Sequence, residues 1–186
     1  PGTPLRPGQI HDVNRTTLCT IVEAHGGEAV AIAVAADTLA ALNAALTEAL
    51  TCDAIVFSGG SSVGDRDLLI DLLQSRGDVI FHGVATRPGK PTAFGRIEGT
   101  PVFGMPGNPT SCLTNAYVML VPFVRTLAHL PAYRPHVVRA PLARRVASAP
   151  DRTQFYTVRL MDGRAEPAFK ASGDITSMAH ADGYVE

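Results

Sequence analysis

Blocks with the 3.6-residue periodicity of helices alternate with short apolar runs over the greater part of the sequence. The short runs are typical of buried strands, because nearly all of their positions are apolar. In chain order, the pattern predicts a helix over 16–25, a strand over 29–34, a helix capped by Asp37, a strand over 54–57, a helix over 68–76 and a strand over 79–81.

The next part of the sequence predicts a hairpin followed by a long helix. Two strand-like runs fill residues 92–103, with Glu98-Gly99 at the turn between them. Asn108-Pro109 has the composition of a helix start, because proline at the first helical position lacks only an N–H that the helix would not use. The apolar helix that follows should reach about residue 129, with a kink at Pro122.

This order of elements defines a fold class and a domain boundary. Helices alternating with buried strands imply an α/β protein, with helices on both faces of a mostly parallel sheet in three α/β/α layers. Beyond a proline-rich break, residues 136–146, 154–160 and 164–169 alternate in the manner of strands. We therefore expect an α/β/α domain over 1–131 and a small β-barrel-like domain over 132–186.

Composition narrows the classes of partner. Sixteen Lys and Arg against 17 Asp and Glu give a formal net charge of -1, so no global positive field attracts nucleic acid or an anionic membrane. The 46% of hydrophobic residues suffices for a sizeable core. The longest uncharged apolar stretch, 112–124, is too short to span a bilayer. The expected ligands are small molecules.

The cysteines indicate the cellular compartment, and the first residues indicate whether the chain is part of a longer protein. Three widely spaced cysteines with no CxxC pattern argue against a disulfide framework and against a zinc site, which favours a cytoplasmic location. Residues 1–7 read as the middle of a loop, so we expect the chain to be a fragment of a longer protein.

The first candidate for chemistry is the glycine-rich loop over 58–67, which follows a strand and opens a helix. Its glycines allow close backbone approach, and the helix N-terminus offers free N–H groups to an anion. The alternative is a tight strand-to-helix connection without a ligand. Asp65 and Asp67 would repel a phosphate unless Mg²⁺ lay between them; alternatively they only stabilise the helix N-terminus.

Two further loops present groups suited to oxyanions. Arg87-Pro88-Gly89-Lys90-Pro91 holds two cations on a stiff backbone, although a solvated surface turn is the commoner fate of such residues. A second loop, 104–108 with Ser111, also opens a helix. No GxSxG, HExxH or Cys/His spacing supports covalent or zinc chemistry, so a site that orients charges is expected.

Four motifs together carry a resemblance to a known family. They occur in this order: Asp12-Val13-Asn14-Arg15, Ser58-Gly59-Gly60-Ser61-Ser62-Val63-Gly64-Asp65, Pro88-Gly89-Lys90-Pro91 and Gly104-Met105-Pro106-Gly107-Asn108-Pro109. The sequence resembles the molybdopterin molybdenumtransferases, the MoeA and gephyrin E-domain family, and residues 172–183 resemble the end of that family's C-terminal β domain.

The resemblance implies a fold and an activity. The fold would be a MoaB/Mog-like molybdopterin-binding domain followed by the small β domain. The activity would be the insertion of molybdate into adenylylated molybdopterin, with release of AMP and help from Mg²⁺. A homodimer of the full-length protein and contact with the upstream adenylyltransferase are further expectations.

The resemblance also implies roles for individual residues. Pterin or nucleotide contacts are expected from Asp12, Asn14, Ser58, Gly59, Gly60, Ser61, Ser62, Gly64, Gly107 and Asn108. Molybdate would be framed by Lys90, Pro91, Pro106, Ser111 and Arg152. Asp67 and Lys90 are the expected catalytic residues, and Asp67 with Asp37 the expected magnesium ligands.

Some departures from the family pattern affect these expectations. Ala36 stands where one member of an acidic pair is usual, and Gly83 and Arg87 stand where lysines are often found. Family members also carry upstream domains that complete the site, so the chain alone should bind weakly and turn over poorly. The alternatives are a molybdopterin adenylyltransferase, which lacks the β tail, and a non-catalytic molybdopterin-binding or scaffold module.

Overall fold

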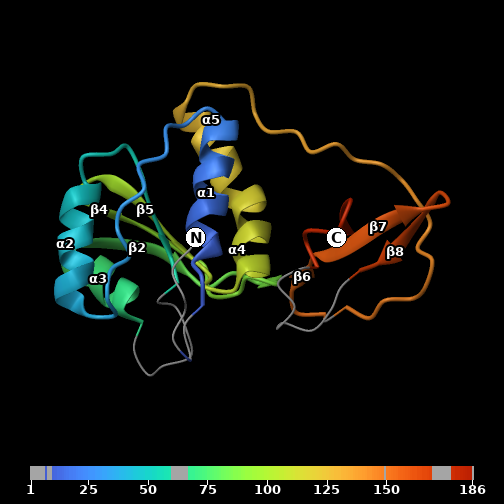
Figure 1. The fold of residues 1–186 in the computed structure, drawn as a ribbon, viewed down its shortest axis with the longest axis horizontal. Helices are drawn as coiled ribbons and strands as arrows, with labels where there is room; N and C mark the ends of the chain where they lie inside the picture. The colour runs from blue at the N-terminus through green and yellow to red at the C-terminus, as the bar shows by residue number, and fades with distance from the viewer. Residues whose placement is uncertain (1–6, 8–9, 60–66, 149, 169–176, 186) are drawn as a thin grey trace.

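A sheet between two layers of helices forms the first part of the molecule, and a smaller sheet forms the second (Figure 1). The computed structural model describes residues 7, 10–59, 67–148, 150–168 and 177–185. Within these ranges the α/β class, the three layers and the separate small sheet agree with the sequence-based prediction.

The central sheet has four strands. In sheet order they are β1 (Ile55–Ser58), β5 (Thr100–Met105), β4 (Ala93–Ile97) and β2 (Gly77–His82). β1 pairs with β5 in parallel, whereas β4 pairs antiparallel with both β5 and β2. Among the described strands the sheet is therefore mixed, which corrects the expectation of a mostly parallel one. The reason is the two-residue turn at Glu98 and Gly99, which forces β4 and β5 to run antiparallel.

Helices cover both faces of this sheet. One face carries α2 (Leu39–Ala49) and α3 (Leu68–Arg76). The other face carries α1 (Val13–Ala24), α4 (Pro109–Asn115), the π-helical turn η1 (Ala116–Leu120) and α5 (Val121–Leu127). Figure 1 shows α2 and α3 on one side of the strands, and α1, α4 and α5 together on the other.

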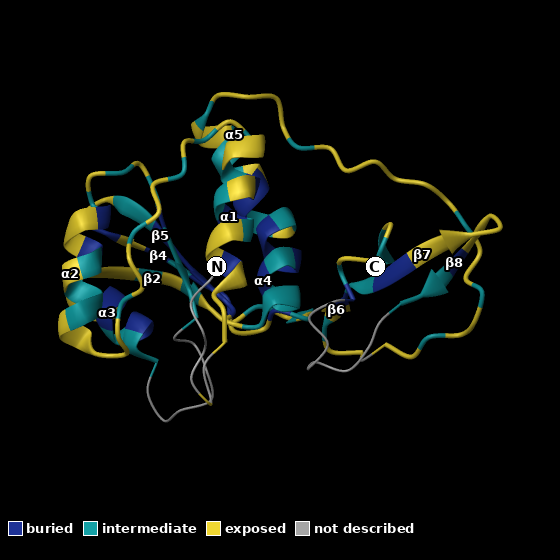
Figure 2. Cartoon of the chain, viewed as in Figure 1, coloured by how far each residue is buried: buried dark blue, intermediate teal, exposed yellow. Residues whose placement is uncertain are grey.

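The side chains of β5 point alternately to the two faces of the sheet, and each face has its own hydrophobic core. Val102 packs with Leu72 and Leu73 of α3, whereas Phe103 and Met105 pack with Leu18 of α1 and the helices after β5. Successive strand residues point to opposite faces of a sheet, so one apolar strand serves both cores. The buried residues shown in Figure 2 follow these inner faces.

The helix ends mostly follow the predicted chemistry. Asp67 caps α3, which ends at Gly77, and Asn108 caps α4 with proline at the first turn. The cap of α2 is Thr38, whose Oγ1 accepts from the Ala41 N–H, so the prediction of Asp37 was wrong by one residue. The long helix is interrupted by η1 just before Pro122, which has no N–H to continue the helical ladder.

The apolar run over 29–34 is extended but belongs to no strand, contrary to the prediction. Only Ile32 packs against the core, while Val30 and Val34 are exposed. A run of apolar residues specifies burial, but a strand also needs a neighbour to complete its hydrogen-bond ladder. In the part of the chain that the structure describes, this run has no such neighbour.

The C-terminal part holds a short antiparallel sheet. Its strands are β7 (Tyr156–Met161), β8 (Arg164–Pro167) and β9 (Gly183–Val185), with β7 in the centre. Residues 136–146 form no strand beyond a single bridge at Leu142, which corrects one expectation. The turn at Asp162 and Gly163 has positive φ values, in line with the predicted hairpin.

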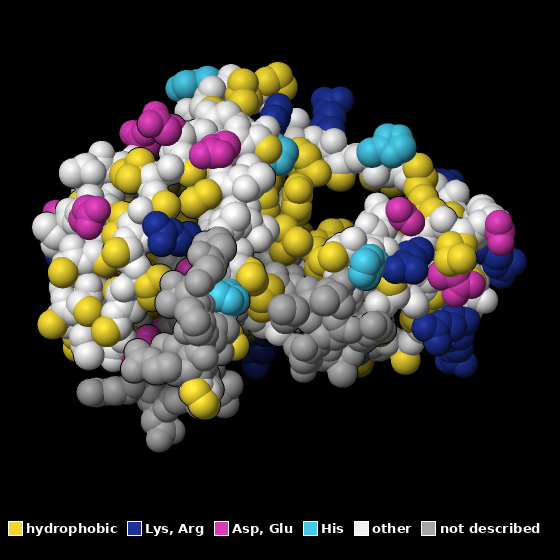
Figure 3. All heavy atoms as spheres, viewed as in Figure 1, with side chains coloured by type: hydrophobic (Ala, Val, Ile, Leu, Met, Phe, Trp, Pro, Cys, Tyr) yellow, Lys and Arg dark blue, Asp and Glu magenta, His cyan; other side chains and the backbone are white. Residues whose placement is uncertain are grey.

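On the face drawn in Figure 3, acidic and basic side chains are interspersed. Within the described ranges, every helix is too short or too polar to cross a membrane.

Candidate functional site

Three of the predicted loops leave the central sheet at the same end. β1 is parallel to β5, with Ser58 opposite Met105, so both strands finish together. β4 is antiparallel to β5, with Ala93 opposite Gly104, so the turn that precedes β4 lies at that end too. The register therefore brings Ser58-Gly59, the Gly89–Thr92 turn and residues 106–108 to one edge, as the sequence predicted.

The first and third of these loops touch through their backbones. The Gly59 N–H donates to the Met105 carbonyl at 3.2 Å. A Cβ added at Gly107 would lie 3.4 Å from the Gly59 Cα, at van der Waals contact, so the two loops lie against each other here. Asn14, which is buried, donates from Nδ2 to the carbonyl of Gly107 at 2.9 Å and of Pro106 at 3.4 Å. Asn14 thus holds the 106–108 loop in place, and its expected contact with pterin or nucleotide stays a prediction.

Asp12 and Asn108 both act as helix caps. Asp12 Oδ1 accepts from the Arg15 N–H at 3.0 Å, and Asn108 Oδ1 accepts from the Ser111 N–H at 3.2 Å. Ser111 also donates its hydroxyl to Asn108 Oδ1 at 3.4 Å. These bonds fix the starts of α1 and α4 beside the loop end of the sheet.

The Gly89–Thr92 turn is held from inside by α4. Asn115, which is fully buried, donates from Nδ2 to the Gly89 carbonyl at 2.8 Å and to Thr92 Oγ1 at 2.5 Å. Thr92 Oγ1 donates in turn to the Gly89 carbonyl at 2.9 Å. Gly89 has a φ of 107°, and a Cβ there would lie 2.2 Å from Asn115 Nδ2. Only glycine fits this turn, which carries Lys90 to the surface.

A pocket of about 350 Å³ opens beside Lys90. Lys90 comes from the central domain, and Arg152 comes from the C-terminal part. His82 and Asp151 also line it. Thr86 is a further lining residue, and its buried Oγ1 has no hydrogen-bond partner among the described residues. Two cations and an unused hydroxyl suit a tetrahedral oxyanion.

One carboxylate in this pocket opposes an anion. Asp151 accepts from Arg152 through both oxygens, with distances of 2.6 Å to Nη2 and 3.1 Å to Nε. The hydrogen bonds from Arg152 hold the pKa of Asp151 below its ordinary value, and Lys90 contributes in the same direction. The same pairing raises the pKa of Arg152. An incoming oxyanion must therefore compete with Asp151 for the guanidinium.

A short parallel ladder fixes Arg152 relative to Lys90. β3 (Thr86–Arg87) pairs with β6 (Thr153–Gln154), which follows Arg152 directly. The Thr153 N–H donates to the Ala85 carbonyl, and the Phe155 N–H donates to the Arg87 carbonyl, both at 2.8 Å. The two sides of the pocket are thus joined by backbone hydrogen bonds.

Asp67 serves mainly as the α3 cap. Its Oδ1 accepts from the N–H groups of Leu69 at 3.1 Å and Ile70 at 3.3 Å, and its Oδ2 lies 3.7 Å from His82 Nε2. Asp37 is exposed and lines a different groove beside β1. Within the described ranges no three His, Cys, Asp or Glu residues lie where they could hold a metal ion. A magnesium site needs several oxygen ligands, so a role for Asp67 and Asp37 in holding Mg²⁺ stays a prediction.

The structure brings some of the predicted site residues together at the loop end of the sheet, whereas others lie outside the residues that it describes. Predicted residues at the loop end of the sheet are Asn14, Ser58, Gly59, Lys90, Pro91, Pro106, Gly107, Asn108 and Ser111, with Asp12 at the adjoining start of α1. Gly60, Ser61, Ser62, Gly64 and Asp65 lie outside the described residues. Ligand contacts by all of these residues remain predictions.

Sequence reasoning missed Thr86, Thr92, Asn115 and Asp151. Asn115 is the one side-chain amide in the uncharged stretch 112–124, and this was the one signal available in the sequence.

Comparison with known proteins identifies the family. Residues 2–126 match the family described as a probable molybdopterin binding domain. This match places the chain among proteins with a molybdopterin-binding domain. Residues 139–186 match the MoeA C-terminal region, domain IV, so the chain belongs more particularly to the MoeA family.

Individual relatives agree with this assignment. Molybdopterin molybdenumtransferase 2 of Mycobacterium tuberculosis is 42% identical over 144 residues, which are 73% of this chain and 36% of the relative. The molybdopterin molybdenumtransferase of Haemophilus influenzae is 37% identical over 68% of this chain and 31% of its own length. The chain thus spans about a third of these curated relatives.

A solved structure matches the whole fold. The molybdopterin biosynthesis MoeA protein from Pyrococcus horikosii superposes with a TM-score of 0.82 at 40% identity. The match covers 100% of this chain and 46% of the Pyrococcus chain.

Proposed function

We propose that this chain is the ligand-binding part of a molybdopterin molybdenumtransferase, which inserts molybdate into adenylylated molybdopterin and releases AMP in molybdenum cofactor biosynthesis. The observation that carries the proposal is the pocket where Lys90 and Arg152 meet from two parts of the chain, beside the unpartnered hydroxyl of Thr86. The names of the relatives supply the activity. The match to the MoeA C-terminal region favours this activity over an adenylyltransferase.

Molybdate is the ligand for this pocket. Lys90 provides a point charge on a rigid turn, and Arg152 provides a planar donor pair across from it. Their charges offset the dianion once it displaces Asp151 from the guanidinium. Thr86 Oγ1 supplies a hydroxyl donor to one molybdate oxygen. These groups bind and orient molybdate.

The adenylylated molybdopterin lies along the neighbouring loops. Gly59 and Gly107 leave their backbones open at the same end of the sheet as Lys90. Glycine backbones admit close approach by phosphate oxygens, and Asn14 keeps the 106–108 loop in place. Both substrates then bind at the same edge of the sheet. Holding the two reactants close together lowers the entropic cost of their reaction.

Calorimetric titration with molybdate tests the pocket. The wild-type chain should bind, and Lys90→Met should weaken the affinity about tenfold, because it removes one charge-assisted contact. Arg96→Met is the matched control, since Arg96 is an exposed cation on β4 outside the pocket, and its affinity should be unchanged. Equal binding by the wild type and Lys90→Met would contradict the proposal.

Turnover is a separate matter, because the relatives are much longer than this chain. We expect the isolated chain to show no measurable AMP release from adenylylated molybdopterin, with or without Mg²⁺. Molybdate-dependent release of AMP by these 186 residues would contradict this expectation and show that they suffice for catalysis. Dimerisation, contact with an adenylyltransferase and a cytoplasmic location are further parts of the proposal.

A further inference from the structure

The Lys90 pocket requires two parts of the chain to keep a fixed relative position, because Lys90 and Arg152 come from different parts. The β3–β6 ladder is one connection between them, and it pairs only two residues of each strand. Such a short ladder fixes one region of contact but leaves the C-terminal sheet free to rock about it. A binding group must be held within narrow limits of distance and angle. The orientation of Arg152 therefore needs a second contact, away from the ladder.

Tyr184 of β9 makes such a contact with its ring. The ring lies edge-on to Phe155, with the centroids 6.1 Å apart and an interplanar angle of 76°. Phe155 follows β6 directly, and its N–H donates to the Arg87 carbonyl of β3. Tyr184 thus packs against a residue that lies close to Arg152 in the sequence and takes part in the ladder.

The hydroxyl of Tyr184 reaches the helices of the central domain. It shares a hydrogen bond with Thr114 of α4, which is fully buried, and Tyr117 and Tyr133 lie nearby. Its other neighbour is Met178 Sδ at 3.5 Å, a weak acceptor. Burial raises the pKa of Tyr184, and the hydrogen bond with Thr114 opposes that rise. Tyr184 therefore joins the C-terminal sheet to α4.

The same helix supports the other side of the pocket. Thr114 immediately precedes Asn115, which donates to the Gly89 carbonyl beneath Lys90. Through these neighbouring residues, α4 meets both the turn that carries Lys90 and the sheet that carries Tyr184. The relative position of the two cations thus depends on how the C-terminal sheet sits against α4.

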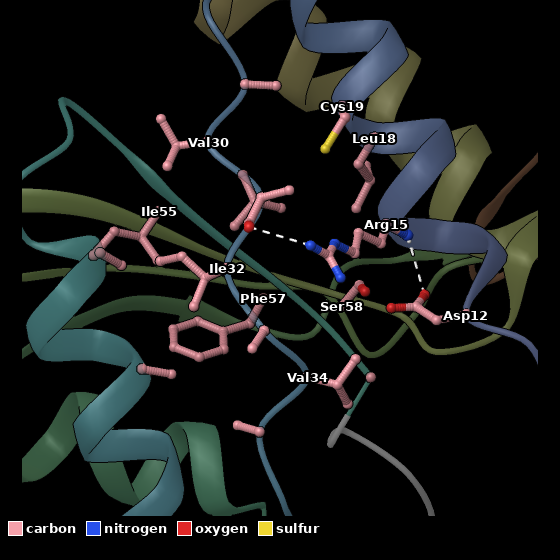
Figure 4. Close-up of a pocket in the computed structure, with 18 of the residues that line it drawn as sticks. Asp12, Arg15, Leu18, Cys19, Val30, Ile32, Val34, Ile55, Phe57 and Ser58 are labelled. Carbon is pink, nitrogen blue, oxygen red and sulfur yellow. Dashed lines mark hydrogen bonds between the residues drawn. The ribbon is translucent and has the colours of Figure 1, made fainter. Parts of the chain in front are cut away.

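The apolar groove beside β1 has a different construction (Figure 4). All of the described residues that line it belong to the central domain, with α1 and β1 on either side in the figure. A shift of the C-terminal part would leave that groove unchanged, whereas it would separate the two cations of the Lys90 pocket.

We propose that Tyr184 is a positioning residue for the molybdate pocket, which orients Arg152 toward Lys90 by fixing the C-terminal sheet against α4. This inference rests on the proposed function, because the anion concerned is the same molybdate. Tyr184 does not line the pocket, so it acts through Arg152 and not by touching the anion.

Calorimetry with molybdate on the 186-residue chain tests the route through Arg152. Tyr184→Ala should weaken binding about fivefold and Tyr184→Phe about threefold, because alanine removes ring and hydroxyl whereas phenylalanine removes only the hydroxyl. In an Arg152→Ala background, either substitution should change the affinity less than about twofold. Equal losses in both backgrounds would overturn the proposal, because a general loss of stability acts whether or not Arg152 is present. If Tyr184→Ala fails to fold, Tyr184→Phe alone decides the comparison.

Tyr156→Phe is the matched control. Tyr156 lies on β7 of the same sheet, and its hydroxyl donates to the Ala147 carbonyl within the C-terminal part. The variant loses a tyrosine hydroxyl that bonds its own part of the chain, so it should bind molybdate as the wild type does. A loss equal to that of Tyr184→Phe would contradict a special role for Tyr184.

Amide hydrogen exchange by NMR gives a second test that needs no ligand. The N–H groups of Thr153 and Phe155 donate across the ladder to Ala85 and Arg87. Tyr184→Ala should speed exchange at both amides about tenfold, because the C-terminal sheet can then rock and open the ladder. Unchanged exchange would overturn the proposal.

The molybdate titrations separate this inference from the proposed function. Absence of binding by the wild type would contradict the proposed function and this inference with it. Binding that depends on Lys90 and Arg152 but not on Tyr184 would overturn this inference alone.

Discussion

The two sides of the Lys90 pocket are built in opposite ways. On the central-domain side, buried Asn115 and Thr92 bond the Gly89 carbonyl beneath Lys90. On the C-terminal side, Arg152 is held by an exposed carboxylate next to it in the sequence, and by the β3–β6 ladder. The buried network fixes a position, whereas the exposed pair leaves its guanidinium open to competition.

This difference separates stability from affinity. Water cannot replace a buried hydrogen bond, so losing that bond lowers the free energy of unfolding. An exposed ion pair exchanges readily with water and contributes little to stability. We therefore expect substitutions on the Gly89 side to act first on folding, and substitutions on the Arg152 side to act first on the bound anion.

The largest effect is expected for Gly89→Ala. The new Cβ would overlap the Asn115 amide, and the φ of 107° disfavours any side chain, so the loss should be about 3 kcal/mol in urea unfolding. Gly99→Ala is the control, because Gly99 has a φ of 86° but no atom within 4 Å of the added Cβ. It should lose about 1 kcal/mol. Equal losses would mean that the Asn115 contact does not constrain the turn.

Asn115→Ala should come next. It removes the donor to the Gly89 carbonyl and to Thr92, at a cost of about 1–3 kcal/mol in the free energy of unfolding. Molybdate affinity should also fall, because the turn that carries Lys90 loosens. Asn43→Ala removes a surface amide on α2 and should leave molybdate affinity unchanged. A stability loss without an affinity loss would limit Asn115 to a structural role.

For Arg152→Ala we expect a loss of molybdate affinity without a loss of stability. The urea midpoint should stay at the wild-type value, because the ion pair with Asp151 is exposed. The dissociation constant for molybdate, measured by calorimetry, should rise about tenfold. Unchanged affinity would remove Arg152 from the pocket and leave Lys90 as its main cation.

The smallest effect is expected for Asp151→Asn. The substitution removes the carboxylate that competes for Arg152, so molybdate should bind about two- to fivefold more tightly. Asp162→Asn is a suitable control, since Asp162 lies in the turn between β7 and β8. Weaker binding by Asp151→Asn would mean that Asp151 orients Arg152 toward the anion.

The sequence predicted the local features well, for physical reasons. The helix over 68–76, the hairpin turn at Glu98-Gly99 and the Asn108 cap all rest on interactions within a few residues. The four motifs were also enough to identify the MoeA family. The prediction of a strand over 29–34 was wrong because its ladder depends on a partner that apolar pattern alone cannot specify.

Covalent neighbours and side-chain periodicity therefore determined the helices, the hairpins and the fold class. Only the tertiary structure decided that Asn115 lies beneath Gly89, 26 residues away, and that Lys90 faces Arg152 across two parts of the chain. Hydrogen bonds in helices and turns join residues a few positions apart, so the local sequence determines them. Hydrogen bonds between distant segments depend on how the layers of the fold pack together, which the whole core determines.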